Sequence, residues 1–246
     1  FENVTEKANF KGGKGWSNGV SIVDINQDGL LDIYVNQVGD FEILKGHNLL
    51  FVCQKIGADG VPVYEEQSQK YGLDLIGFGT QAAFFDYDRD GDQDLAILGY
   101  NNFEGAVTRI YRNDNGTLVD TGLPLTKFLS GDIKWTDVNK DGFLDLMVSG
   151  MAAFDDENTA PKTLLYLNNA GQGFTLAPNL GVENLFSTKM ALGDLDNDGD
   201  IDLAIMGYRA SNEAVFQVYK KEGGEQLFTK VNDLNPSVHG PENDWD

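Results

Sequence analysis

The stretch VDINQDGLLDIYV, residues 23–35, places an acidic loop between two apolar runs, and the pattern occurs four times in the 246-residue chain. The other copies are FDYDRDGDQDLAI (85–97), TDVNKDGFLDLMV (136–148) and GDLDNDGDIDLAI (193–205), and all four align without gaps. Their first aspartates are 62, 51 and 57 residues apart. A period of about 40 to 60 residues is typical of the blades of a β-propeller. The pattern therefore indicates a repeat protein.

Each period holds four strand-like segments. One apolar run precedes the loop, as at 20–23, and a second follows it, as at 95–98. A third run, such as 49–53, leads into a turn rich in Gly and Asn, and a short fourth segment ends the unit. This pattern predicts an all-β fold, a β-propeller built from four-stranded antiparallel blades. The expected repeats cover about 11–69, 70–121, 122–178 and 179–233.

Two terminal segments lie outside these repeats. Residues 1–10 begin with FENVT, which resembles the last strand of a blade, so we expect an extra outer strand there. Residues 234–246 end in Asp244-Trp245-Asp246, similar to the entry to the third loop, and are expected to begin a further repeat. Four visible blades plus one strand indicate part of a larger propeller, or a unit that another chain completes. A self-contained ring of four or five blades is the alternative.

The loops share one arrangement of oxygen-bearing side chains. Counting the first Asp as position 1, each loop has Asp or Asn at positions 1, 3, 5 and 9 and Gly at position 6. Alternate residues of a tightly curled loop point inward, and Gly permits the sharp turn. Calcium takes six to eight oxygens at roughly 2.3–2.6 Å, so we expect about four Ca²⁺ ions, each also bound by the position-7 carbonyl. The predicted ligands are Asp24, Asn26, Asp28, Leu30, Asp32, Asp86, Asp88, Asp90, Asp92, Asp94, Asp137, Asn139, Asp141, Phe143, Asp145, Asp194, Asp196, Asp198, Asp200 and Asp202.

Other interpretations of the loops fit less well. An EF-hand needs flanking helices and a bidentate Glu at position 12. That position is an apolar strand residue in every loop: Val35, Ile97, Val148 and Ile205. Zinc is disfavoured because the two histidines, His47 and His239, do not neighbour a loop. Magnesium prefers fewer protein ligands, and metal-free Asx-turns would leave up to four carboxylates repelling one another.

The four copies of D-x-[DN]-x-D-G-x-x-D resemble the FG-GAP/VCBS repeats of integrin α-subunit propellers and of many bacterial secreted proteins. The likeness extends over nearly the whole chain. Phe78-Gly79 is similar to the FG element of that family, and residues 80–88 resemble bacterial members of the ASPIC/UnbV type. The resemblance implies calcium in the hairpin between the first and second strands, and an extracellular, cell-surface or periplasmic setting. It implies no activity, because adhesins, lectins and enzyme accessory domains all use such folds.

The composition limits the classes of partner that the chain is expected to bind. A net charge of −21, from 39 acidic and 18 basic residues, argues against nucleic acid, since phosphate contacts need clustered Lys and Arg. No apolar run approaches the roughly 18 residues that a membrane span needs. The one cysteine, Cys53, lies in an apolar run and is expected to be a buried small hydrophobe. Without disulfides, calcium is expected to contribute much of the stability.

Two matches to enzyme motifs are weak. GWSNG, residues 15–19, matches the nucleophile elbow with Ser17 at its centre, but an elbow needs a strand before it and a helix after it. GFGTQA, residues 77–82, mimics a dinucleotide fingerprint but leads into a strand. We therefore expect no enzymatic activity.

The most variable segments suggest where a ligand would bind. They connect the second and third strands of each repeat, on the face opposite the calcium loops, at 38–46, 101–107, 151–162 and 209–213. Variable loops on a regular scaffold often carry recognition, so we expect a non-catalytic binding or adhesion module with a protein or glycan ligand. Residues 154–157 are a candidate contact. The alternatives are a subunit of an extracellular assembly, joined to its own copies by strand addition, and a lectin-like accessory domain of a polysaccharide-processing protein.

Overall fold

A computed structural model describes most of the chain, and all the helical or strand structure in the described part is β-strand. The described residues are 2–11, 15–39, 47–75, 77–101, 103–153, 158–222 and 226–234. The strands form four four-stranded antiparallel sheets, in which neighbours in sequence are neighbours in space. The predicted four-stranded units are thus confirmed, and each sheet is called a blade below. This described part contains no helix that is long and apolar enough to cross a membrane.

The strands of each blade alternate in direction and follow the predicted apolar runs. The first blade is β1 (Trp16–Val23), β2 (Asp32–Gly39), β3 (Leu49–Ile56) and β4 (Pro62–Glu66). The second is β5 (Gly77–Phe85), β6 (Asp94–Asn101), β7 (Gly105–Asp114) and β8 (Thr117–Asp120). The third is β9 (Lys127–Thr136), β10 (Asp145–Ala153), β11 (Thr159–Asn168) and β12 (Phe174–Leu176). The fourth is β13 (Phe186–Gly193), β14 (Asp202–Tyr208), β15 (Ala214–Lys221) and β16 (Phe228–Leu234).

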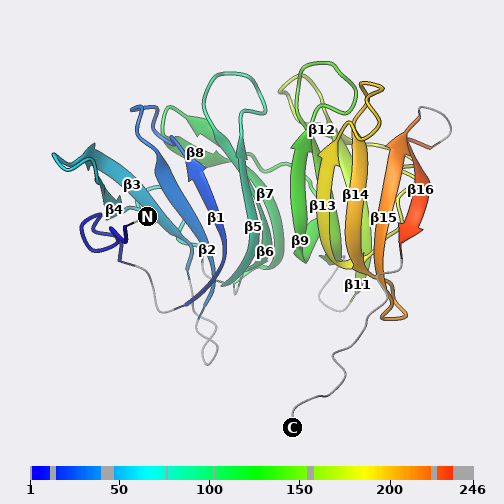
Figure 1. The fold of residues 1–246 in the computed structure, drawn as a ribbon, viewed down its shortest axis with the longest axis horizontal. Helices are drawn as coiled ribbons and strands as arrows, with labels where there is room; N and C mark the ends of the chain where they lie inside the picture. Colours follow the sequence, from blue (N-terminus) through cyan, green and yellow to red (C-terminus); the bar gives the residue numbers. More distant parts are fainter. Residues whose placement is uncertain are drawn as a thin grey trace, which may run out of the picture.

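The blades pack face to face in a row, with their first strands in the order β1, β5, β9 and β13 (Figure 1). A hydrophobic layer fills each junction. Between the first two blades, Tyr34 and Leu50 meet Leu95 and Tyr111, and Leu73 of the connecting segment is fully buried there. Similar layers join the second blade to the third and the third to the fourth. Burying one large apolar side chain stabilises a fold by about 1.5–3 kcal/mol, so these layers hold the row together.

The two ends of the row differ from its interior. The outer face of β1 exposes Trp16, Val20 and Ile22, and the outer face of β14 exposes Met206 and Tyr208. Within the described ranges, β1 and β13 do not pack extensively against each other. The arrangement is therefore β-propeller-like, with an open blade face at each end.

The predicted N-terminal strand is not formed, and residues 4–10 make a turn instead. Ala8 N donates to Val4 O at 2.8 Å, and Phe10 N donates to Thr5 O at 3.0 Å. The Phe10 ring stacks on Phe51 with 4.0 Å between the ring centroids, and Tyr64 N donates to Ala8 O at 2.9 Å. A strand needs a partner strand for its backbone groups. This segment satisfies its own groups locally and lies against the first blade.

The same turn connects the first and second blades. There, Tyr71 N donates to Gln67 O at 3.2 Å and Leu73 N donates to Ser68 O at 2.9 Å, in the same order along the chain. Asn9 and Gly72 occupy the equivalent left-handed position, with φ of 56° and 68°. Residues 4–10 are thus a second copy of the connector at 67–73.

The predicted repeat boundaries stay predictions. The blades themselves occupy residues 16–66, 77–120, 127–176 and 186–234. Residues 235–246 lie outside the described part, so the expected start of a further repeat is also still a prediction.

Candidate metal centre

Each acidic loop joins the first and second strands of its blade, and all four lie at the same edge of the row. They follow β1, β5, β9 and β13, whose arrows point toward the upper edge in Figure 1. The second strand of each blade ends at the opposite edge, because consecutive strands of a blade are antiparallel. The four candidate sites are therefore neighbours in space although more than 50 residues separate them in sequence.

The backbone of each loop curls around its first carboxylate. In the first loop, Asp24 accepts hydrogen bonds from Asp28 N at 3.1 Å and from Gly29 N at 2.9 Å. The same pair of bonds forms at Asp86, Asp137 and Asp194. The position-6 glycine has a φ between 82° and 97° in all four loops, a conformation in which a Cβ is strained. The glycine in the motif is thus required by the turn.

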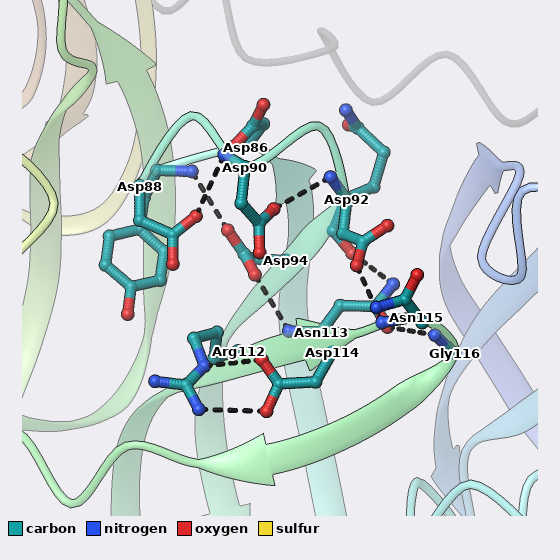
Figure 2. Close-up of polar contacts among 12 residues, drawn as sticks. Asp86, Asp88, Asp90, Asp92, Asp94, Arg112, Asn113, Asp114, Asn115 and Gly116 are labelled. Atoms are coloured by element: carbon teal, nitrogen blue, oxygen red, sulfur yellow. Dashed lines mark hydrogen bonds and ion pairs between the residues drawn. The ribbon is translucent and has the colours of Figure 1, made fainter.

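The position-9 aspartate ties the loop to the third strand of its own blade. In the second loop, Asp94 accepts from Tyr87 N at 2.9 Å and from Asn113 N of β7 at 2.8 Å (Figure 2). Asp32, Asp145 and Asp202 are bound in the same way and, like Asp94, are fully buried. Burial raises the pKa of Asp94 to about 7, because the charged form loses water that two backbone donors replace only in part.

The remaining oxygens gather into sets suited to a hard cation. In the second loop, oxygens of Asp86, Asp88 and Asp94 lie within 4.8 Å of one another. Asp194, Asp196 and Asp202 form the same cluster in the fourth loop. The first and third loops have Asn at position 3, and Asn26 Nδ2 donates to Asp28 at 3.0 Å. The side-chain oxygens at positions 1, 3 and 9 are thus brought together in the second and fourth loops, and carboxylate oxygens are the ligands that calcium takes.

The family follows from a comparison with protein-family models. The model for the FG-GAP-like repeat matches residues 86–148 and again residues 137–205. Residues 86–205 therefore consist of FG-GAP-like repeats. Each match runs from the first Asp of one acidic loop into the strand that follows the next acidic loop. Each match therefore includes two of the loops described above.

Part of the chain is also similar to a curated protein. Mouse integrin alpha-7 is 32% identical over 114 residues, which are 42% of this chain. The aligned stretch is 10% of the integrin's length, so the chain spans a small part of that relative.

In the second and fourth FG-GAP loops, the side chain at position 7 interacts with residues outside its own loop. Asn115 N donates to the Asp92 carboxylate at 2.6 Å (Figure 2). Lys140 and Lys221 both pair with the Asp200 carboxylate, at 2.8 and 3.0 Å. The Asp92 and Asp200 side chains are therefore held by groups outside their own loops, and the role of the position-7 carbonyl of Leu30, Asp92, Phe143 and Asp200 stays a prediction.

The fourth FG-GAP loop has an additional cation beside its predicted ligands. Lys220 pairs with Asp196, and this hydrogen bond lowers the pKa of the aspartate. Asp194 and Asp196 are exposed, whereas Asp86 and Asp88 are half-buried. The fourth loop therefore resembles the others in geometry but differs in its surroundings.

Contacts between neighbouring FG-GAP repeats were not predicted from the sequence. Asn113 Nδ2 donates to Ile25 O at 2.9 Å, and Asn168 Nδ2 donates to Tyr87 O at 2.9 Å. Each asparagine comes from the third strand of one blade and caps the loop of the preceding blade. The sequence does show an Asn at the same place in the second and third repeats. It does not show which carbonyl that Asn contacts, because the contact depends on how the blades pack.

Proposed function

We propose that this chain is a calcium-stabilised extracellular β-propeller module that binds a protein or glycan ligand without catalysis. The four acidic loops of shared geometry carry the proposal. In each, carboxylate or amide oxygens at positions 1, 3, 5 and 9 and the position-7 carbonyl would hold one Ca²⁺ ion. The ion would supply the positive charge that neutralises these carboxylates, and so add to the stability of the fold.

The extracellular adhesion role rests on the likeness to an integrin α-chain and to FG-GAP repeats in general. The connections between second and third strands are proposed as the ligand face, because they vary most in sequence and lie opposite the acidic loops. Part of this face is described: the turn at 209–213 is closed by a hydrogen bond from Arg209 N to Glu213 O at 2.9 Å. The candidate contact at 154–157 lies outside the described residues.

The absence of catalysis is part of the same proposal. Ser17 of the GWSNG segment lies within β1, and residues 77–82 lie within β5. A nucleophile elbow and a dinucleotide loop both need a turn between a strand and a helix. The local structure of these two segments therefore gives no support to either enzyme reading.

The decisive experiment is thermal unfolding in millimolar calcium and in excess chelator, with bound metal counted by native mass spectrometry. We expect about four calcium ions and a large chelator-induced fall in melting temperature, since metal that binds only the folded state stabilises it. An unchanged melting curve with no bound metal would overturn the calcium proposal. A glycan array and a screen of extracellular proteins would then test the ligand face.

A second candidate function is a structural subunit of an extracellular assembly. The observation that favours it is the pair of open blade faces, with Trp16, Val20 and Ile22 at one end and Met206 and Tyr208 at the other. Exposed apolar surface of this kind marks interaction sites. The earlier idea of strand addition by residues 1–10 is weakened, because residues 4–10 form a turn. Ordered polymers by electron microscopy would favour assembly, and a monomer with a ligand would favour adhesion.

A further inference from the structure

The fourth residue of each acidic loop lies outside the predicted ligand set, and in the first three loops it reaches the next loop along the row. These residues are Gln27, Arg89, Lys140 and Asn197, and all have positive φ, between 56° and 64°. All four are exposed on the edge where the loops lie. A non-glycine residue at positive φ is uncommon, and here it occurs at the same place in every loop.

The first bridge joins the first loop to the second. Gln27 Nε2 donates to Gly91 O at 2.8 Å and also to the carboxylate of Asp92. Gly91 and Asp92 are positions 6 and 7 of the second loop. The bridge therefore holds the segment whose position-7 carbonyl is proposed to bind calcium.

The next two bridges also reach position 7 of the following loop, but through a cation–π contact and an ion pair. The Arg89 guanidinium lies over the Phe143 ring, 5.3 Å from its centroid. A Cβ on Gly142 would come within 2.9 Å of Arg89 Nη1, so the glycine also makes room for the bridge. Lys140 Nζ pairs with the Asp200 carboxylate at 2.8 Å. In all three cases a position-4 side chain contacts positions 6 or 7 of the following loop.

We propose that these position-4 side chains couple neighbouring metal loops, so that calcium in one loop favours calcium binding in the next. The inference rests on the proposed calcium function. Binding would fix the curled conformation of one loop, including the positive φ at position 4. The side chain then holds positions 6 and 7 of the next loop, which lowers the cost of ordering that loop. Gln27, Arg89 and Lys140 are thus positioning residues rather than ligands.

The test is a calcium titration that reads each loop separately. In ¹⁵N-labelled protein, the backbone amides of Gly29, Gly91, Gly142 and Gly199 report the four loops one by one. The variant Gln27→Asn shortens the bridge while keeping a residue type that tolerates positive φ. We expect the calcium dissociation constant of the second loop to rise about threefold to tenfold, the effect of losing one hydrogen bond. Because coupling between two sites is reciprocal, the first loop should lose affinity only to the extent that the second loop is already occupied.

Two further variants separate coupling from simple stabilisation. Asn197→Ala changes position 4 of the fourth loop and should leave the first three loops unaffected. Asp24→Asn weakens the first loop, and we expect it also to weaken the second loop in the wild-type background but not in the Gln27→Asn background. Such a double-mutant cycle isolates the coupling from the separate effects of each change.

The outcomes are distinguishable. If calcium binds but the second loop keeps its affinity in Gln27→Asn, coupling is overturned and the proposed function stands, even if the melting temperature falls. If wild-type protein binds no calcium in any loop, the proposed function fails and coupling fails with it. A fall in second-loop affinity that Asp24→Asn reproduces only when Gln27 is present would support the proposal.

Discussion

The first three acidic loops and the fourth share one motif and one set of internal hydrogen bonds, yet they lie in different surroundings. The residue at position 2 shows this most clearly. Ile25, Tyr87 and Val138 are 0%, 5% and 1% exposed beneath the following blade, whereas Leu195 is 54% exposed. The comparison shows that the motif alone specifies the curled loop, while the next blade in the row buries the side chain at position 2.

The cover consists of specific contacts in the first two loops. Asn113 and Asn168 cap the carbonyls of Ile25 and Tyr87 from the following blade. The turn of that blade also abuts the loop, since a Cβ on Gly171 would lie 2.9 Å from Asp88 Cα. The fourth loop has no following blade among the described residues. Four predictions probe this difference, in order of decreasing expected effect.

The largest difference in stability is expected between variants of Asp94 and Asp202, the buried position-9 aspartates of the second and fourth loops. Asp94→Ala leaves the buried N–H groups of Tyr87 and Asn113 without acceptors, and each such group costs about 1–3 kcal/mol. We expect a loss of about 2–6 kcal/mol in the free energy of unfolding, measured by urea denaturation in chelator. Asp202→Ala should cost less, because water reaches the N–H of the exposed Leu195. Equal losses would mean that the cover of the loop is irrelevant.

The next prediction compares the side chains at position 2. Ile25→Ala removes a fully buried side chain and should lower the free energy of unfolding by about 2–5 kcal/mol. Leu195→Ala should cost less than about 1 kcal/mol, as is usual for an exposed site. Denaturation in saturating calcium, with the oligomeric state checked by gel filtration, measures both. A cost for Leu195→Ala close to that of Ile25→Ala would show that another blade or a second copy covers this face in solution.

A smaller effect is expected for the residue that caps the preceding loop. Asn113→Ala removes the hydrogen bonds from Nδ2 to Ile25 O and Gln93 O and the bond that Oδ1 accepts from Gly116 N, and should cost about 1–3 kcal/mol. Lys221 occupies the equivalent place in β15, where it pairs with the partly exposed Asp200. Lys221→Ala is the matched control and should cost less than about 1 kcal/mol. The reverse order in denaturation experiments would contradict the capping role.

The smallest effect concerns the segment that leads into the fourth blade. Hydrogen bonding to Arg209 lowers the pKa of Glu183 below its usual value of 4.5. A carboxylate with a lowered folded-state pKa stabilises the protein above about pH 4.5, and this stability is lost as the pH falls through the lowered pKa. Glu183→Gln should therefore lower the melting temperature slightly at pH 7 but not at pH 2. A difference that persists at pH 2 would point to packing instead.

The blades and loops were predictable because the information is local. Positions 1 to 9 bond to one another within a few residues, so the spacing of Asp and Gly already encodes the curl. In the second and fourth loops, the predicted side chains at positions 1, 3 and 9 lie together for the same reason. The alternating apolar runs likewise gave the four strands of each blade, whose pairing needs only short connections.

What the sequence did not reveal depends on partners far along the chain. Residues 2–5 of the FENVT segment have strand-like character, but no strand in the described part of the chain pairs with them, and residues 4–10 form the connector turn. The bridges from Gln27 and Arg89 were missed because a polar residue at position 4 is also expected in any exposed loop. Their partners appear only when successive blades are placed side by side (Figure 1).

The repeated connector has a consequence for how such a chain can be lengthened. Residues 4–10 and 67–73 make the same turn, and Phe10 packs on Phe51 much as Leu73 packs beside Tyr111. Each of these two connectors packs on the third strand of the blade that follows it, so residues 4–66 form one structural unit of connector and blade, and residue 67 begins the next. Splicing at these turns would add or remove whole blades while leaving every strand register and every loop intact.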